Sequence, residues 1–387
     1  MIRSISLILF LLGNFLAISQ SEILNEGDSL LANGNYSKAI SVYLDYNKPS
    51  EIYAKIAKAN VAVGNYNQAL QYFKLYIEEN PADALSKYEY TKLLLKTKNF
   101  EEAIQNLSQL LKVNNKNPDY HYLMGLVMEK TKDSMAIAQF QRTFDLDQNH
   151  QKALFKLAKH ALIKRHHEVS HFYIDKGLEA YPENLELISL KAQNYYHQQY
   201  YKEAKLWFKK LVDLGESSEF IHEKLSMLYS EFGEWENAIE EQKKALKYNP
   251  QNARGIFVLG TYYEGLQNYQ QAELYYKKAL QLQDQPLDYE YQKLGYVLNR
   301  QQKHPEAIAA YQKAVKENPD DYAARFYVLT SKDAYYADVD AKIELYKDYI
   351  KNAPDNHFSI HFANRRLQEL KEEKFTSEAD SNQQAKN

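Results

Sequence analysis

Residues 256–279 read IFVLGTYYEGLQNYQQAELYYKKA. Apolar and aromatic side chains recur in this stretch every three or four residues, which predicts helices that each bury one stripe. A Leu-Gly pair stands at Leu259 and Gly260, and Ala272 follows three residues after Tyr269. Because small side chains let two helices approach closely, the stretch predicts a pair of helices in contact.

The second half of this stretch recurs along the chain. Its pattern is an aromatic residue, two polar residues, a small residue, three more residues and then an apolar or aromatic residue. The clear copies begin at Tyr36, Tyr66, Phe100, Tyr201, Trp235, Tyr269 and His304, and weaker copies centre on Ala136, on Ser170 and near Lys342. The small residue stands at positions 39, 69, 103, 136, 170, 204, 238, 272, 307 and about 342, in steps of 30, 34, 33, 34, 34, 34, 34, 35 and 35.

This pattern and its period of 34 residues resemble the tetratricopeptide repeat (TPR), a helix–turn–helix unit. The resemblance covers about residues 20–356. It implies an all-α, right-handed superhelical solenoid of about ten repeats, because one unit cannot bury both of its apolar stripes and stacking buries them. The predicted units are 20–49, 50–83, 84–116, 117–150, 151–184, 185–218, 219–252, 253–287, 288–322 and 323–356.

The first 19 residues predict a secretory signal peptide. Arg3 precedes an apolar stretch from Ile5 to Ile18, which is shorter than the roughly 20 residues that a spanning helix needs. Small residues at Ala17 and Ser19 suit cleavage after Ser19. We therefore expect an exported protein, periplasmic or extracellular and cell-surface, with no membrane span after cleavage; an uncleaved anchor is the alternative. The leader, which ends in Ser-Gln, resembles those of exported proteins from Bacteroidetes-type bacteria.

The C-terminal end predicts a capping helix over 357–374 and a disordered tail over 375–387. Ile360, Phe362, Leu367 and Leu370 are expected to cover the open end of the array, with charged residues such as Arg366 facing water. The tail is polar and lacks aromatic residues after Phe375.

Composition excludes several kinds of function. The net charge is −3 at pH 7, which gives no basic excess to follow a phosphate backbone, so we expect no nucleic-acid partner. The chain has no cysteine, which excludes disulfides and thiolate chemistry. Tyrosine is abundant, at 34 residues, and suits half-buried packing sites and binding surfaces.

One motif matches a catalytic signature. His167-Glu168-Val169-Ser170-His171 fits H-E-x-x-H, in which two histidines on one helix face bind zinc and the glutamate is the general base. The repeat offers another account, because Ser170 occupies the small-residue column and both histidines occupy packing columns. We favour that account and predict no enzyme, no metal site and no cofactor, with a zinc hydrolase as the least favoured alternative.

The resemblance also indicates where a partner binds, because the first helix of each TPR unit lines an inner concave surface. Aromatic rings, amides and lysines gather on that face and suit a protein or peptide partner. We expect a protein-binding scaffold or adaptor of the cell envelope; a glycan-binding protein in nutrient uptake is the alternative. The candidate partner-binding residues are Tyr88, Lys92, Phe155, Lys159, Gln193, Tyr196, Phe257, Tyr289, Gln292, Tyr296, Asn299 and Tyr327.

Overall fold

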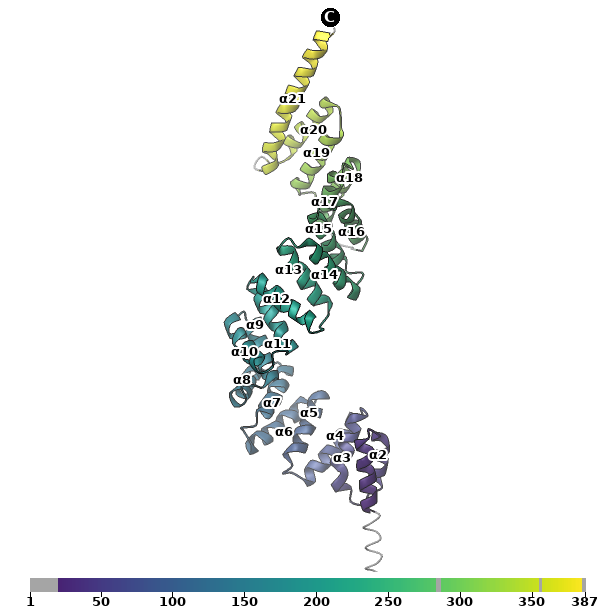
Figure 1. The fold of residues 1–387 in the computed structure, drawn as a ribbon, viewed down its shortest axis with the longest axis vertical. Helices are drawn as coiled ribbons and strands as arrows, with labels where there is room; N and C mark the ends of the chain where they lie inside the picture. Colours follow the sequence, from purple (N-terminus) through teal and green to yellow (C-terminus); the bar gives the residue numbers. More distant parts are fainter. Residues whose placement is uncertain (1–19, 283–286, 355–356, 385–387) are drawn as a thin grey trace, which may run out of the picture. The chain divides into compact units, whose positions relative to one another are not determined.

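The computed structural model describes residues 20–282, 287–354 and 357–384, so the predicted leader over 1–19 lies outside the described residues. The chain divides into two compact units, one ending at Leu190 and the other beginning at Lys191. Figure 1 labels the helices in chain order. Every described element is a helix, and within each unit helices pack against their neighbours in sequence, as α3 does against α4 and α17 against α18. The prediction of an all-helical repeat solenoid is confirmed.

The first unit begins with a helix over 20–32. Its further helices are α2 (Tyr36–Leu44), α3 (Pro49–Ala62), α4 (Tyr66–Glu79), α5 (Ala84–Lys96), α6 (Phe100–Val113), α7 (Pro118–Lys130), α8 (Ala136–Leu146), α9 (Gln151–Ile163), α10 (His167–Ala180) and the start of α11 (Leu185–His197).

The second unit begins within α11 and continues to the C-terminal helix. Its helices are α12 (Tyr201–Asp213), α13 (Glu219–Glu231), α14 (Trp235–Tyr248), α15 (Ala253–Gly265), α16 (Tyr269–Leu282), α17 (Asp288–Arg300), α18 (His304–Glu317), α19 (Tyr322–Tyr335), α20 (Val339–Asn352) and α21 (Phe358–Gln384). Each unit expected from the sequence holds two of these helices; the unit 253–287, for example, holds α15 and α16.

The small-residue column lies where paired helices meet. Every member from Ala39 to Ala307 is buried, with at most 5% of its surface exposed. Near the last position the column ends: Lys342 forms an ion pair with Asp333 at 3.4 Å, and Ile343 is the buried residue of that turn. In the last repeat, larger side chains therefore stand at the helix contact where the earlier repeats have a small residue.

A second small column faces the first from the preceding helix. Its buried members include Ala57, Ala158, Ala192, Gly260 and Gly295. A methyl group added at Gly260 would lie 2.6 Å from Cδ1 of Tyr276, and one at Gly295 would lie 2.7 Å from Cε1 of Tyr311. The glycines of the Leu-Gly pairs thus make room for a buried tyrosine of the partner helix.

Nine of the described turns between paired helices share one backbone feature, which the turn between α19 and α20 lacks. Each of the nine places one residue in the left-handed region, which glycine adopts at little cost. Gly34, Gly64 and Gly233 fill this position in three turns. Lysine, arginine or glutamine fills it in six others, at Lys98, Lys132, Arg165, Gln199, Gln267 and Gln302. The turn geometry is therefore retained where the sequence does not provide glycine.

The C-terminal helix differs from its prediction in three ways. It continues to Gln384, past the predicted end at residue 374, because no Gly or Pro interrupts the segment that was expected to be disordered. Leu370 and Ala363 are buried as cap residues, but Phe362 is 51% exposed. Arg366 does not face water alone, because its Nε donates to Asp333 at 3.0 Å. Position on the helix, rather than hydrophobicity, decides which residue covers α20.

One carboxylate connects neighbouring repeats in the second unit. Glu273 of α16 accepts hydrogen bonds from Lys277 at 2.6 Å, from Lys303 at 2.8 Å and from Gln301 at 2.9 Å. Burial opposes its ionisation, but these donors outweigh burial and lower the pKa of Glu273 to about 2.

We predict that Gly260→Ala destabilises the fold, although alanine is the better helix former by about 1 kcal/mol. The Tyr276 ring cannot move aside easily, because it is buried and its hydroxyl donates to Glu264 at 2.6 Å. Overpacking costs about 1–3 kcal/mol, so the melting temperature should fall by a few degrees. Thr261→Ala on the same helix is the control. A Gly260→Ala protein at least as stable as the native chain would contradict this packing account.

We predict that Glu273→Gln lowers the melting temperature at pH 7 but not near pH 2. A carboxyl whose folded pKa is depressed stabilises the fold above its unfolded pKa, and this contribution is lost as the pH falls from about 4.5 to about 2. Thermal unfolding across this range measures the difference between the two proteins. Glu306→Gln, at an exposed glutamate of α18, should show no such convergence.

Candidate functional site

A groove of about 550 Å³ lies along α17 in the second unit. The helices α15, α18 and α19 complete it. Its lining residues are Glu264, Tyr289, Gln292, Lys293, Tyr296, Asn299, Arg300, Tyr311, Tyr327 and Thr330. Five of these are candidates from the sequence, namely Tyr289, Gln292, Tyr296, Asn299 and Tyr327. The structure thus brings together the candidates of the ninth and tenth repeats.

Three tyrosines of the groove present their rings to solvent. Tyr289 is 54% exposed, Tyr296 is 42% exposed and Tyr327 is 39% exposed. Each ring also rests on another aromatic ring: Tyr327 lies 5.4 Å from Tyr311, and Tyr296 lies edge-on to Tyr269 at 6.4 Å. Rings held in this way lose little conformational freedom when a ligand packs against them.

The amide groups of the groove already have partners within the protein. Gln292 donates to Asp321 at 2.7 Å, and Asn299 donates to Ser331 at 2.7 Å. These bonds connect α17 to the next repeat and fix both side chains. A primary amide has two N–H donors and a carbonyl acceptor, so each side chain keeps further capacity for a ligand.

The charged groups of the groove leave it mildly basic. Lys293 donates to Glu264 at 2.9 Å, which pairs one cation with one carboxylate. Arg300 is exposed and its Nε donates to the Tyr269 hydroxyl at 3.1 Å. The guanidinium is thus held by a neutral group and retains its charge for a ligand.

Sequence reasoning missed five of the lining residues: Glu264, Lys293, Arg300, Tyr311 and Thr330. Tyr311 was missed because it belongs to a second helix, α18, whereas the candidates were taken from first helices only. Its place four residues after Ala307 is the position of Tyr276 in the previous repeat, and this repetition was the available signal.

The remaining candidates lie outside this groove. Phe257 is only 9% exposed and packs on Tyr276 at 5.0 Å, so its selection as a surface residue was wrong. The centre of the Phe257 ring lies 5.8 Å from the centre of the Tyr289 ring, so the two rings pack together. In the second unit, the ammonium nitrogen of Lys224 lies 4.2 Å from the centre of the Tyr196 ring. Gln193 is partly buried.

The candidates of the first unit form two ring–lysine pairs. Lys92 lies 5.6 Å from the Tyr88 ring, and Lys159 lies 5.6 Å from the Phe155 ring. Burial raises the pKa of Tyr88 to about 12, so its hydroxyl stays protonated at neutral pH. Lys92 also forms an ion pair with Glu89 at 3.0 Å, so its positive charge is paired within the protein.

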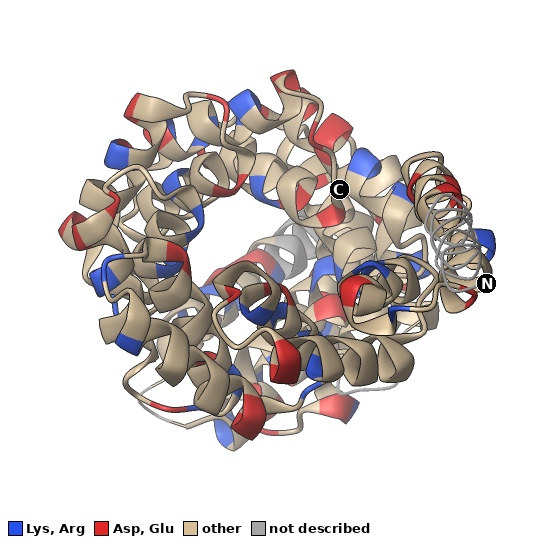
Figure 2. Ribbon diagram, turned by 90° about the horizontal axis from the view of Figure 1, so that it is seen from below, with Lys and Arg blue, Asp and Glu red and all other residues tan. Residues whose placement is uncertain are grey.

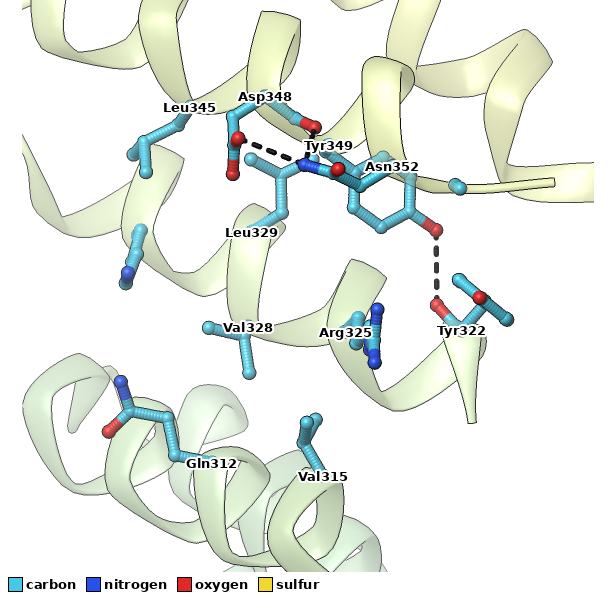
Figure 3. A pocket seen from close by; sticks show the side chains of 12 residues that line it. Gln312, Val315, Tyr322, Arg325, Val328, Leu329, Leu345, Asp348, Tyr349 and Asn352 are labelled. Atoms are coloured by element: carbon cyan, nitrogen blue, oxygen red, sulfur yellow. Dashed lines mark hydrogen bonds between the residues drawn. The ribbon is translucent and has the colours of Figure 1, made fainter. Parts of the chain in front are cut away.

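A second hollow, of about 300 Å³, lies among α18, α19 and α20 (Figure 3). Val315, Val328, Leu329 and Leu345 supply its apolar surface. Polar side chains border it, and among them Asn352 donates to the Asp348 carboxylate at 3.0 Å. None of the sequence candidates lines this hollow.

The H-E-x-x-H segment forms the first turn of α10. Ser170 is buried and its hydroxyl donates to the carbonyl of Ala158 at 3.0 Å, as the small-residue column requires. His167 and His171 are each partly buried. Within the described ranges, no group of three or more histidine, aspartate or glutamate side chains is arranged to hold a metal ion.

Figure 2 shows basic and acidic residues interspersed along the ribbon. Across the part of the chain that the structure describes, no helix combines the length and the apolar character that crossing a membrane requires.

Comparison with known proteins gives matches in both units. Family models described as tetratricopeptide repeat match residues 61–127, 224–286 and 293–328. A TPR repeat-containing protein of Methanocaldococcus jannaschii is 24% identical over 284 residues, which cover 69% of this chain and 43% of that protein. The chain therefore spans less than half the length of this curated relative.

Solved structures are also similar, and two of them are described as TPR proteins. One from Parabacteroides merdae has a TM-score of 0.45 at 16% identity and covers 64% of this chain and 98% of its own. MamA has a TM-score of 0.40 at 21% identity, covering 42% and 95%. YrrB, described as a TPR protein with an unusual peptide-binding site, has a TM-score of 0.33 at 14% identity, covering 56% and 95%.

The matched segments contain helix pairs whose small residues are buried at a period of about 34 residues, as in α5 and α6 or α15 and α16. Tetratricopeptide-repeat models thus match segments in both compact units of the chain.

Proposed function

We propose that this protein is an exported scaffold that holds an extended segment of a partner protein in the groove along α17. Tetratricopeptide repeats are typical of protein-interaction scaffolds, and models of this repeat match segments in both units. The observation that carries the proposal is the gathering of three exposed tyrosine rings, Tyr289, Tyr296 and Tyr327, in one groove.

The chemistry of the groove suits a peptide. Aromatic residues are frequent energetic anchors of protein interfaces, and a ring that is already fixed binds at a lower entropic cost. The amides of Gln292 and Asn299 keep donors and acceptors for a peptide backbone. Arg300 adds a positive charge, which favours a ligand segment with a carboxylate near it.

Export rests on the sequence of the first 19 residues, with a short apolar stretch and small residues before Gln20. We propose a location in the cell envelope or outside the cell on this ground. An envelope scaffold would hold partner proteins during assembly there.

We predict that Tyr296→Ala weakens peptide binding by at least tenfold, because truncating an interface anchor costs about 2 kcal/mol or more. Peptides selected from a phage-displayed library against the purified protein serve as probes, and titration calorimetry measures their dissociation constants. Tyr181→Ala, at a 58% exposed tyrosine of the first unit, is the control and should bind normally.

Two results would contradict peptide binding in the groove along α17. One is equal binding by the native and Tyr296→Ala proteins. The other is an equal loss in Tyr181→Ala. A glycan array probed in parallel addresses the alternative class of ligand, and a signal that depends on Tyr296 there, without peptide binding, would replace the peptide proposal.

We predict that the protein produced in a bacterium with a general secretory pathway is cleaved after Ser19. N-terminal sequencing of protein from the envelope fraction should begin at Gln20. Protein that retains Met1 or Ile2 and stays in the cytosolic fraction would contradict export. Arg3→Glu, which removes the positive charge before the apolar stretch, should slow the processing.

A further inference from the structure

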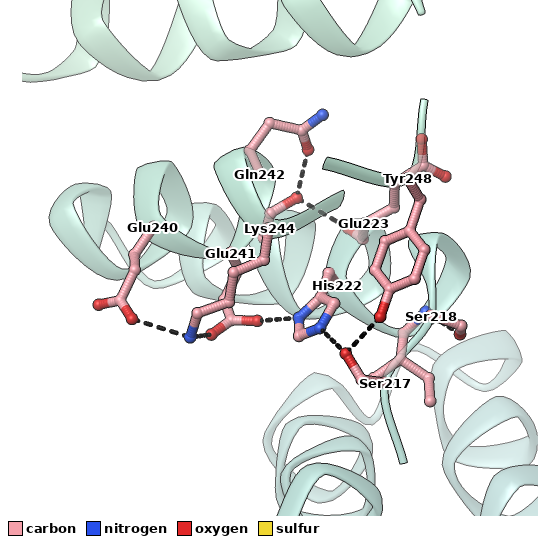
Figure 4. Close-up of polar contacts among 11 residues, drawn as sticks. Ser217, Ser218, His222, Glu223, Glu240, Glu241, Gln242, Lys244 and Tyr248 are labelled. Atoms are coloured by element: carbon pink, nitrogen blue, oxygen red, sulfur yellow. Dashed lines mark hydrogen bonds and ion pairs between the residues drawn. The ribbon is translucent and has the colours of Figure 1, made fainter. Parts of the chain in front are cut away.

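Four polar side chains form a continuous hydrogen-bonded chain beside the start of α13 (Figure 4). Ser217 Oγ lies 2.8 Å from Nε2 of His222, and His222 Nδ1 lies 2.6 Å from Oε2 of Glu241. Tyr248 OH lies 2.6 Å from Ser217 Oγ. Glu241 and Tyr248 come from α14, so the α13–α14 pair assembles the cluster.

When the His222 ring is neutral, the protons in this chain have one consistent arrangement. The Lys244 ammonium lies 2.9 Å from Oε1 of Glu241, which favours an ionised carboxylate that can only accept. Nδ1 of His222 therefore donates to Glu241, which leaves Nε2 of the neutral ring as an acceptor. Ser217 donates its proton to Nε2, and Tyr248 donates to the Ser217 oxygen.

Burial divides the cluster into a protected base and an accessible hydroxyl. The side chains of His222 and Glu241 are 4% and 11% exposed. Ser217 and Tyr248 are both exposed, so a solute can reach the serine oxygen without displacing the histidine. The Tyr248 ring lies nearly parallel to the His222 ring at 6.3 Å and covers one side of it.

The start of α13 adds donors close to Ser217. Ser218 is the N-cap, and its carbonyl accepts the first backbone bond of the helix, from His222 N–H at 3.1 Å. The amides of Glu219 and Phe220 precede that bond and have no acceptor within the helix. The Tyr248 hydroxyl, 2.6 Å from Ser217 Oγ, is the donor that the structure places beside the negative charge that develops there.

We propose that Ser217, His222 and Glu241 form an acyl-transfer site that hydrolyses small, accessible carboxylic esters. Ser217 is the nucleophile and His222 is its general base, while Glu241 is a positioning residue that holds the productive tautomer of His222. This site is separate from the α17 groove and does not depend on the proposed scaffold function.

The reaction balances with water as the only co-reactant. The Ser217 oxygen bonds to the ester carbonyl carbon as its proton passes to His222 Nε2. The carbon–oxygen bond to the leaving alcohol then breaks, and Nε2 returns the proton to that oxygen. Water, deprotonated by Nε2, attacks the acyl-serine, releases the carboxylic acid and restores the Ser217 hydroxyl.

A fluorophosphonate probe tests the nucleophile on the full chain, because the serine oxygen displaces fluoride and keeps the phosphonyl group. Peptide mapping by mass spectrometry should place the label on Ser217 and not on its neighbour Ser218. The Ser217→Ala protein, changed at an exposed residue, should fold normally and take no label. Label distributed equally over Ser217 and Ser218, or absent from both, would overturn the proposal.

Two carboxylates around Lys244 give a matched pair for the positioning role. Glu241→Gln should slow labelling of the folded protein by about 100-fold, since it removes the partner of His222. Glu240→Gln should leave the rate unchanged, because Glu240 bonds Lys244 at 2.8 Å but does not touch His222. Equal rates in both variants, with circular dichroism showing both folded, would reduce Glu241 to a structural residue and refute the triad.

Hydrolysis of p-nitrophenyl acetate tests turnover. The native protein should release nitrophenolate at least tenfold faster than Ser217→Ala, over many equivalents. A native rate equal to that of Ser217→Ala would show that the cluster does not act on esters and would overturn the proposal.

Discussion

The contact between a small residue on one helix and a buried side chain of its partner sets the geometry of every described repeat up to the ninth. Ala272 and Gly260 let α15 and α16 approach until the Tyr276 ring fills the space between them. Where the ring is missing, its replacement follows the same logic: in the seventh repeat Gln242 stands in the ring position and accepts a hydrogen bond from Ser226 at 2.8 Å. The groove along α17 adjoins one of these contacts, because Tyr311, which packs over Gly295, also lines the groove.

Much of the fold could be predicted because its determinants are local and repeated. The small-residue column predicted the number of helix pairs. The residues on one face of the first helices included Tyr289, Tyr296 and Tyr327. The errors occurred where the outcome depends on the neighbouring repeat. Phe257 was selected by its position on α15, but Tyr276 and Tyr289 cover it. Phe362 looked like a cap residue, but α20 meets the side of α21 that carries Ala363 and Leu370. No spacing rule along a single helix contains that information.

The H-E-x-x-H segment and the cluster of Ser217, His222 and Glu241 also differ in how far the sequence alone reveals their roles. The H-E-x-x-H segment is contiguous and visible in the sequence, yet its central Ser170 serves the packing column. Ser217, His222 and Glu241 match no motif, since they lie on a turn and on two different helices. They meet only because α13 and α14 pack with a fixed register, which the small-residue contact at Ala238 maintains. Pattern searches favour residues close in sequence, whereas a helix pair brings together residues about 20 positions apart.

Packing between sequential neighbours also has a mechanical consequence. Within each unit, helices are stabilised mainly by their neighbours in sequence, as α13 is by α14, and hardly any contact ties one repeat to a distant one. Pulling on the two ends would load the terminal hairpin first and detach repeats in succession. The force record would then consist of many low, similar steps, and on release the remaining repeats would serve as a template on which each detached hairpin closes again.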